Sequence, residues 1–359
     1  MNNVPCLYGL ENTNRKDKDL WGKNQFNSAF PVSLACYMWD NNIFPITIKV
    51  DGNLSFIQDT AIGFIDVFGA SRDCIQFDFE DSFKPFSKFL YDDIDRIDLI
   101  VRKIINQRQK EYVRPLEIKL TVLPDSTTYR NNKENTWGCE LVIRPVSSSY
   151  AILTMFSNVG ENKEARAIVE STASTIADWN NVSEILNKSK SIIDCMQSYI
   201  CKFYKYQQAF LIQPIWKTKG QSPDLSDNCF DIFVWTDFML CKVIVDSAEN
   251  SLIAGKDKVT RSIRECARML RCLYELHTRG KVNIRQIYRS MDFGHQTDKA
   301  VAFSGKYMHR YMKSERLAQP LIKKDVLKHI ILNGGENELN PERRFDASIY
   351  FAYKGIMEK

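Results

Sequence analysis

The stretch IDLIVRKIINQRQKEYVRPLEIKLTV, residues 97–122, contains the clearest structural pattern in the sequence. Apolar side chains occupy every second position near its start (Ile97 to Val101) and again toward its end (Leu116 to Val122). Alternation with a period of two is typical of a β-strand with one buried face. The wholly polar residues 106–111 separate the two runs. The stretch therefore predicts two antiparallel strands joined by a turn.

Strands and helices are expected on both sides of this hairpin. Short apolar or alternating runs predict further strands at residues 61–69, 139–144, 209–216 and 230–245. Longer patterns predict helices over residues 161–206 and 259–278, and residues 28–39 are expected to form a helix or a buried segment. Both strands and helices are therefore expected in the fold.

The second strand of the hairpin contains Glu117 and Lys119, which are two positions apart and therefore project from the same face. Asp98 lies on the first strand, where its carboxylate can approach that of Glu117. Two close carboxylates repel each other unless a cation lies between them. Mg²⁺ prefers such hard oxygen ligands and can polarise a phosphate and activate water. Lys119 can position the water or offset charge on the phosphate.

Other interpretations of these residues remain open. An acid-x-Lys triplet is a weak motif, and Glu161 and Lys163 form a second one in a polar stretch. The hairpin set could also be a surface strand with a cross-strand Glu/Lys ion pair. Asp66 is an alternative first carboxylate on a predicted strand. Glu140 and Asp125 are weaker candidates for additional metal ligands.

Basic residues concentrate in the C-terminal third. Residues 256–344 hold 20 Lys or Arg and 10 Asp or Glu, whereas the whole chain has a net charge of +5. Such a region is suited to contact a polyanion. Four arginines recur three or four positions apart, which predicts one face of a helix: Arg261, Arg264, Arg268 and Arg271. This face is expected to contact DNA; alternatively, it is a solvated face paired with Glu265 and Glu275.

Composition narrows the class of protein. The sequence has no run of about 20 apolar residues and no N-terminal secretory pattern, so a cytosolic protein is expected. None of the ten cysteines forms a pair with the two-residue gap of a zinc or redox motif, and they are interpreted as small buried side chains. The four histidines form no closely spaced pair. A His-rich metal site is therefore not expected.

Five short blocks resemble the HindVP-like type II restriction endonucleases. The N-terminal blocks are WGKNQFNS (residues 21–28), FP (30–31) and LACY (34–37), and the blocks around the Glu-x-Lys triplet are LEIKLT (116–121) and LPDSTT (123–128). The resemblance covers about residues 7–130. It places the hairpin set in the PD-(D/E)xK nuclease superfamily, although Ile97 stands where the signature has proline.

The resemblance implies an α/β fold with a restriction-endonuclease-like core, a mixed β-sheet flanked by helices, within residues 1–250. Residues 251–359 then form a basic, mainly helical region that contacts DNA, or the whole chain forms one domain. It also implies that Asp98 and Glu117 bind Mg²⁺ and that Lys119 is the catalytic lysine.

The expected activity is cleavage of double-stranded DNA at a short palindrome, with GRCGYC as the site found in the family. The resemblance further implies a homodimer, a companion DNA methyltransferase and a location in the bacterial cytosol. Two alternatives remain: a non-catalytic DNA-binding protein with a basic C-terminal face, and a structural or interaction protein that does not bind DNA.

Overall fold

A computed structural model describes residues 46–50, 56–61, 63–120, 140–203, 209–212, 216–219, 222–225, 232–235, 237–254, 258–294 and 301–304. Within them, the strands of the main sheet are β1 (Ile46–Val50), β2 (Phe56–Ala61), β3 (Ile75–Asp81), β4 (Ile97–Asn106), β5 (Gln109–Leu120), β7 (Ala209–Ile212) and β10 (Ile232–Trp235). Two small sheets pair β6 (Glu140–Ile143) with β11 (Val301–Ser304), and β8 (Trp216–Lys219) with β9 (Ser222–Leu225).

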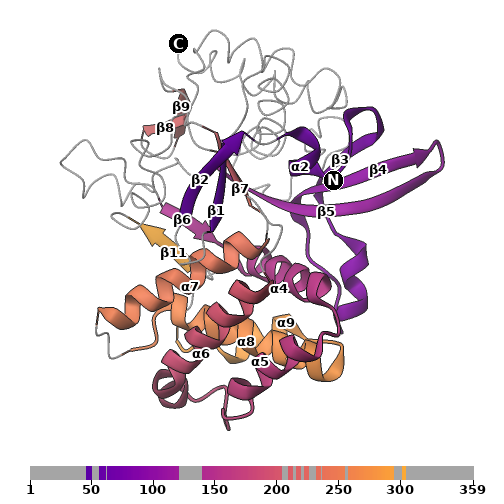
Figure 1. Cartoon of the computed structure of the whole chain (residues 1–359). Coiled ribbons are helices and arrows are strands. Elements are labelled where there is room, and N and C mark those ends of the chain that lie inside the picture. Colours follow the sequence, from indigo (N-terminus) through magenta and orange to yellow (C-terminus); the bar gives the residue numbers. More distant parts are fainter. Residues whose placement is uncertain are drawn as a thin grey trace, which may run out of the picture.

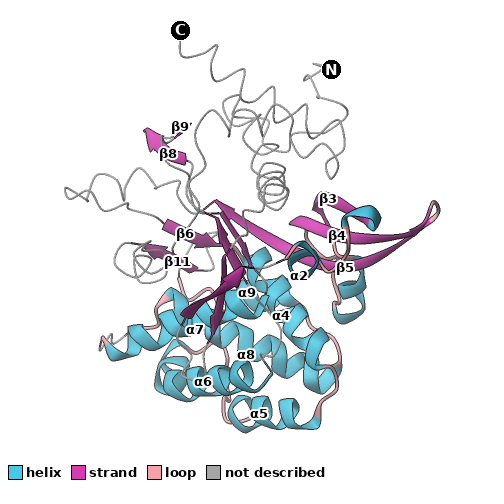
Figure 2. Cartoon of the chain, turned by 45° about the horizontal axis from the view of Figure 1, so that its top comes forward, coloured by secondary structure: helices cyan, strands magenta, loops and turns pink. Residues whose placement is uncertain are grey.

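The longer helices gather together beneath the strands in Figures 1 and 2. They are α4 (Pro145–Val159), α5 (Lys163–Ala173), α6 (Val182–Phe203), α7 (Asp237–Ile253), α8 (Arg261–Arg279) and α9 (Ile284–Ser290). Short helical segments connect the strands: α2 (Phe64–Phe68) and the 3₁₀ turns η2 (Arg72–Cys74) and η3 (Lys84–Phe89).

The strand order of the main sheet is β2-β1-β7-β10-β5-β4-β3. Every pairing between neighbours in this described sheet is antiparallel. The expectation of a mixed sheet is therefore corrected for these strands. For β4 and β5 the physical reason is local, because a two-residue turn joins them and parallel neighbours need a much longer crossover. The α/β class itself is confirmed.

The predicted hairpin is confirmed as β4 and β5. Its turn is only two residues long, Gln107 and Arg108, rather than the whole polar stretch 106–111. The turn contains no glycine. Instead, the side-chain oxygen of Asn106 accepts hydrogen bonds from the backbone N–H groups of Arg108 (3.0 Å) and Gln109 (2.9 Å), which stabilises the tight bend.

Helix termini explain where the predicted helical regions begin and end. The predicted helix over 161–206 is two helices, α5 and α6. Asn162 caps the start of α5 by accepting from the N–H groups of Glu164 and Ala165, so the second Glu-x-Lys triplet is a helix start. The predicted helix over 259–278 is confirmed as α8, which begins after Thr260 and ends at Gly280, whose φ is 71°.

Two predicted strands are partly wrong. The run 61–69 is a strand only at Ala61 and continues as helix α2, which ends at Gly69 with a φ of 75°. The run 230–245 is strand β10 followed by helix α7. Short apolar runs fit either a strand or a helix, and tertiary packing decides between them.

The predicted strands at 139–144 and 209–216 are confirmed, although they are shorter than predicted. Residues 28–39 lie outside the described residues.

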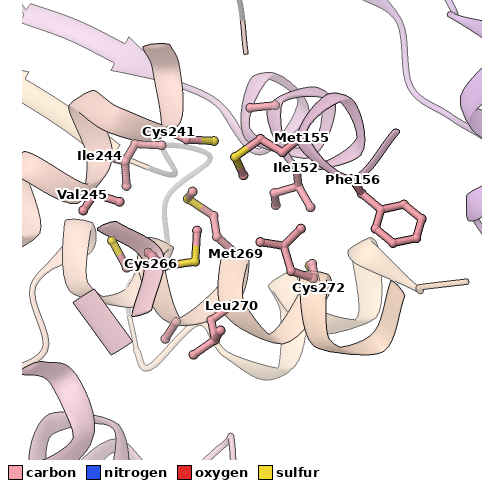
Figure 3. Packing of buried hydrophobic residues seen from close by; sticks show 14 of the residues in the cluster. Ile152, Met155, Phe156, Cys241, Ile244, Val245, Cys266, Met269, Leu270 and Cys272 are labelled. Atoms are coloured by element: carbon pink, nitrogen blue, oxygen red, sulfur yellow. The ribbon is translucent and has the colours of Figure 1, made fainter. Parts of the chain in front are cut away.

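Helices α4, α7 and α8 contribute many of the side chains of one large buried cluster. Figure 3 shows apolar side chains of these three helices meeting there, including Met155, Ile244 and Met269. Helix α8 is central to the helical layer, because it packs against α4, α5, α6, α7 and α9. Helix α7 runs across position 250, and residues on both sides of this position share one buried cluster.

The interpretation of the cysteines as buried side chains is confirmed for four of the six described ones and is wrong for Cys201. The buried ones are Cys195, Cys241, Cys266 and Cys272. Burial is the main cause that raises the pKa of Cys195 to about 11, and it raises the pKa of Cys266 and Cys272 well above 9.0. Among the other described cysteines, Cys74 is half-buried and Cys201 is exposed. None of the described helices combines the length and apolar content needed to cross a membrane.

Candidate active site

Glu117 lies on β5 and is buried, with 6% of its surface exposed. The hydroxyl of Ser147 donates a 2.8 Å hydrogen bond to Glu117 Oε1. Ser147 belongs to the first turn of α4, so this helix covers the face of the strand from which Glu117 projects. Leu116 and Ile118 are buried as well. The strand is therefore buried on both faces at this point, whereas alternation predicted one buried face.

Asp98 lies on β4, next to the end of its pairing with β5. The last paired residues there are Leu99 and Leu116, so Asp98 and Glu117 each lie one residue beyond that pair. The carboxylate Oδ2 of Asp98 accepts a 2.9 Å hydrogen bond from the backbone N–H of Ile118. The hairpin thus brings the two predicted acids onto neighbouring strands. Their roles in chemistry stay predictions.

Lys119 completes the predicted set on the same strand. Its backbone is part of β5 and pairs with Phe233 of β10, while Glu117 pairs with Trp235. The backbone of the Glu-x-Lys segment is therefore paired with β10, and β5 pairs with β4 up to the preceding residue, Leu116. The side chain of Lys119 lies outside the described residues, so its catalytic role remains a prediction.

Asp66, the alternative first carboxylate, occupies a different kind of position. It is exposed on helix α2 rather than on a strand, which corrects the prediction. Its Oδ2 accepts a 3.2 Å hydrogen bond from the backbone N–H of Gly63 at the start of that helix. This contact explains an acid at position 66 without a metal. Glu140 is on β6 in a separate sheet, and Asp125 lies outside the described residues.

The donor set at the hairpin suits a hard divalent cation. Within the described residues there is no group of three or more His, Cys, Asp and Glu side chains that could hold a metal ion. A site built from Asp98 and Glu117 alone matches Mg²⁺, which uses one or two carboxylates and retains water or phosphate oxygens. A zinc site of several nitrogen or sulfur ligands does not match this set.

The predicted arginine face of α8 is largely internal. Arg264 and Arg268 are only 1% and 4% exposed, because α8 is surrounded by other helices. Arg264 donates to the carbonyl of Asp292 (2.8 Å), and burial, with the neighbouring Arg268, lowers its pKa to about 10. The expectation of a solvent-facing stripe is wrong for these two residues, since both side chains are enclosed in the helical layer.

The alternative interpretation is confirmed for the pairing with Glu265 and Glu275 and is wrong for the solvated face, because Arg264 and Arg268 are buried. Arg268 forms an ion pair with Glu265 (3.3 Å), donates to the carbonyl of Tyr288 (2.8 Å) and lies over that ring. Arg271 pairs with Glu275 (3.4 Å). Arg261 and Arg271 are partly exposed, and contact of these two with DNA stays a prediction.

Ser147 is the site residue that sequence reasoning missed. The pair Arg144-Pro145 is a recognisable signal for a helix start, because proline is favoured in the first helical turn. However, nothing in the local pattern indicates that the first turn of this helix contacts Glu117, which is 30 positions before Ser147 in the chain. The contact arises only from the packing of α4 on the sheet.

Comparison with known proteins gives a consistent result. A family model described as HindVP restriction endonuclease matches residues 21–355. The type II restriction enzyme HgiDI of Herpetosiphon aurantiacus is 34% identical over 350 residues, covering 97% of this chain and 96% of that protein. The probable type II restriction enzyme HindVP of Haemophilus influenzae is 33% identical over 352 residues, covering 98% and 94%. No solved structure matches significantly.

Proposed function

Because the chain belongs to the HindVP restriction endonuclease family, we propose that it is a type II restriction endonuclease acting on double-stranded DNA. It hydrolyses phosphodiester bonds at a short palindromic site and requires Mg²⁺. The site expected from the family is GRCGYC. We also propose that it works in the cytoplasm as a homodimer with a companion DNA methyltransferase, because an unrestrained sequence-specific nuclease would cut the DNA of its own host.

The juxtaposition of Asp98 and Glu117 on neighbouring antiparallel strands is the observation that carries this proposal. These carboxylates would hold Mg²⁺, which when bound polarises the scissile phosphate and promotes deprotonation of water. Lys119 would orient the attacking water and offset the negative charge that develops on the phosphate. Each group has one task in hydrolysis.

Two hydrogen bonds keep the carboxylates in place before DNA arrives. Asp98 accepts from the backbone of Ile118, and Glu117 accepts from Ser147. Because both donors belong to regular elements, little reorganisation is needed when substrate binds. The burial of Glu117 also strengthens its interaction with a cation, since a medium of lower dielectric constant screens charge less than water.

Cleavage assays test the proposal directly. Purified protein incubated with duplex DNA should give discrete fragments with Mg²⁺ and intact DNA with EDTA. Lys119→Ala should abolish cutting and retain specific binding. Lys163→Ala is the matched control, since Lys163 ends the second Glu-x-Lys triplet, which starts a helix. The proposal is wrong if Lys119→Ala cuts at the normal rate. Intact DNA with retained binding by the unmodified protein would support the non-catalytic alternative.

The first carboxylate can be tested by a paired substitution. Asp98→Ala should lose cleavage, because it removes an acid beside Glu117. Asp66→Ala should cut at a near-normal rate, because Asp66 is exposed and bonded within α2. The measurement is the initial cleavage rate at saturating Mg²⁺. The reverse outcome, with Asp66→Ala inactive and Asp98→Ala active, would transfer the role to Asp66.

A further inference from the structure

The outer end of the β4–β5 hairpin extends beyond the sheet. In the described chain, the pairing of β4 with β3 ends at Lys103, whereas its pairing with β5 continues to Asn106 and Gln109. Figure 1 shows this end projecting away from the helices, and the second view in Figure 2 agrees. We refer to residues 103–111 as the arm. It is a two-stranded ribbon beyond Lys103.

The arm carries exposed cations. Lys103, Arg108 and Lys110 are exposed, and no ion pair of theirs occurs within the described residues. The only acid of the arm is Glu111, also exposed. By contrast, Arg102, which lies just before the arm, forms ion pairs with Asp78 (2.5 Å) and Asp81 (3.1 Å). The positive charge of the arm is therefore available to an outside partner.

The apex of the arm has a defined shape. The Asn106 carboxamide accepts from the backbone of Arg108 and Gln109, and its nitrogen donates to Gln109 Oε1 (3.3 Å). These bonds hold Arg108 at the turn. Ile105 is 46% exposed and adds an apolar side chain to the surface of the arm. A preorganised ribbon with cations and one apolar contact loses little entropy when it binds.

The dimensions of the hairpin suit a DNA duplex. Asn106 is eight positions from Asp98 on β4, which corresponds to roughly 26 Å at about 3.3 Å per residue. The major groove of B-DNA is about 12 Å wide and admits a two-stranded ribbon. One hairpin can therefore reach across a groove from the phosphate being cut. Two arms from separate copies would bring like charges together, which disfavours the arm as a contact between copies.

We propose that the arm lies in a groove of the DNA duplex and that Arg108 and Lys110 contact backbone phosphates there. This inference rests on the proposed function, since it takes DNA held at Asp98 and Glu117 as the starting point. It assigns the arm to substrate binding rather than to chemistry. Cleavage and arm contact can then be separated by mutation.

The test uses the double substitution Arg108→Ala/Lys110→Ala in a Lys119→Ala chain that binds DNA without cutting it. Each lost phosphate contact lowers the salt dependence of log K by about 0.9, so the slope should fall by about 1.8. Affinity at moderate salt should fall about tenfold or more. Lys188→Ala/Lys190→Ala on α6 removes the same charge elsewhere and should leave both quantities unchanged.

The outcomes are distinct. Equal affinity and equal slope for the arm variant and the Lys119→Ala parent would overturn the arm proposal while the proposed function stands. A parent that does not bind DNA, together with an unmodified protein that does not cut it, would instead overturn the proposed function. Loss of a dimer in light scattering, with an unchanged salt slope per chain, would show that the arm contacts a second copy and would also overturn the proposal. Thermal unfolding should be unaltered, since the replaced side chains are exposed.

Discussion

At the scale of single residues, the Ser147 hydroxyl connects the helical layer to the carboxylate of Glu117. It is 2% exposed and donates directly to Oε1. Groups that hydrogen-bond to a metal-binding carboxylate orient it, and their loss commonly costs about 10–100-fold in metal affinity or activity. Under the proposed function Ser147 is therefore a positioning residue, which acts through Glu117.

We predict that Ser147→Ala raises the Mg²⁺ concentration needed for half-maximal cleavage by about 10-fold or more. Ser148→Ala is a close control, because Ser148 is the next residue in α4, is equally buried, and its hydroxyl has no hydrogen-bond partner among the residues that the structure describes. Titration of initial rates with Mg²⁺ measures the effect. Equal Mg²⁺ requirements in the two variants, at similar thermal stability, would contradict the positioning role.

His277 provides a prediction about pH. It lies on α8 beside the rings of Phe156 and Tyr199, and its Nε2 is 3.2 Å from the Tyr199 hydroxyl. Burial, and to a smaller extent nearby Arg166, lowers its pKa from 6.5 to about 4. The folded protein therefore resists protonation of this ring, whereas the unfolded chain accepts the proton near pH 6.5.

Proton linkage gives the direction in which the stability of the folded protein changes with pH. Between pH 6.5 and about 4 the unfolded chain binds more protons at this residue, so falling pH costs roughly 1.4 kcal/mol of stability per unit. Above pH 6.5 the penalty vanishes. His277→Phe should lose less stability than the unmodified protein between pH 7 and pH 5 in urea denaturation. Parallel loss in both proteins would show that His277 is not the group responsible.

At the scale of elements, the sequence predicted both the β4–β5 hairpin and helix α8, but it did not predict what surrounds α8. The alternation of residues 97–122 predicted both strands, because sheet geometry dictates a period of two. The periodicity of residues 259–278 predicted helix α8 equally well. It did not identify the surroundings of the helix, since the arginine face is closed by Glu265, Tyr288 and the carbonyl of Asp292.

We predict that Arg268→Ala acts on folding rather than on DNA contact. Removing this guanidinium deprives buried Glu265 of its ion-pair partner, and such loss of one partner typically costs about 3–5 kcal/mol. Arg261→Ala should change stability by about 0.5 kcal/mol or less, because Arg261 is partly exposed at the start of α8. Urea denaturation provides the comparison. A stable Arg268→Ala protein whose DNA binding depends less steeply on salt would instead support the sequence-based prediction that Arg268 contacts DNA.

At the scale of the whole molecule, each chain contributes one Asp98–Glu117 pair on the β4–β5 hairpin. Cutting both strands of a palindrome at equivalent positions requires two such pairs related by a twofold axis. We therefore predict two chains per palindromic duplex. Light scattering of the Lys119→Ala protein with a duplex carrying one site should give the mass of that complex. One chain per duplex, combined with cutting of both strands by the unmodified protein, would contradict a dimer.

Local sequence determined the hairpin, the positions of Asp98 and Glu117 on it, the helical character of residues 161–206, helix α8, and the family to which the chain belongs. These features depend on residue periodicity, on capping residues such as Asn162, and on short blocks of residues. Only the tertiary structure decided that Ser147 meets Glu117, that Arg264 and Arg268 are enclosed, and that residues 64–68 are helical. Such outcomes depend on which surfaces meet across long separations in the chain, and no local pattern contains that information.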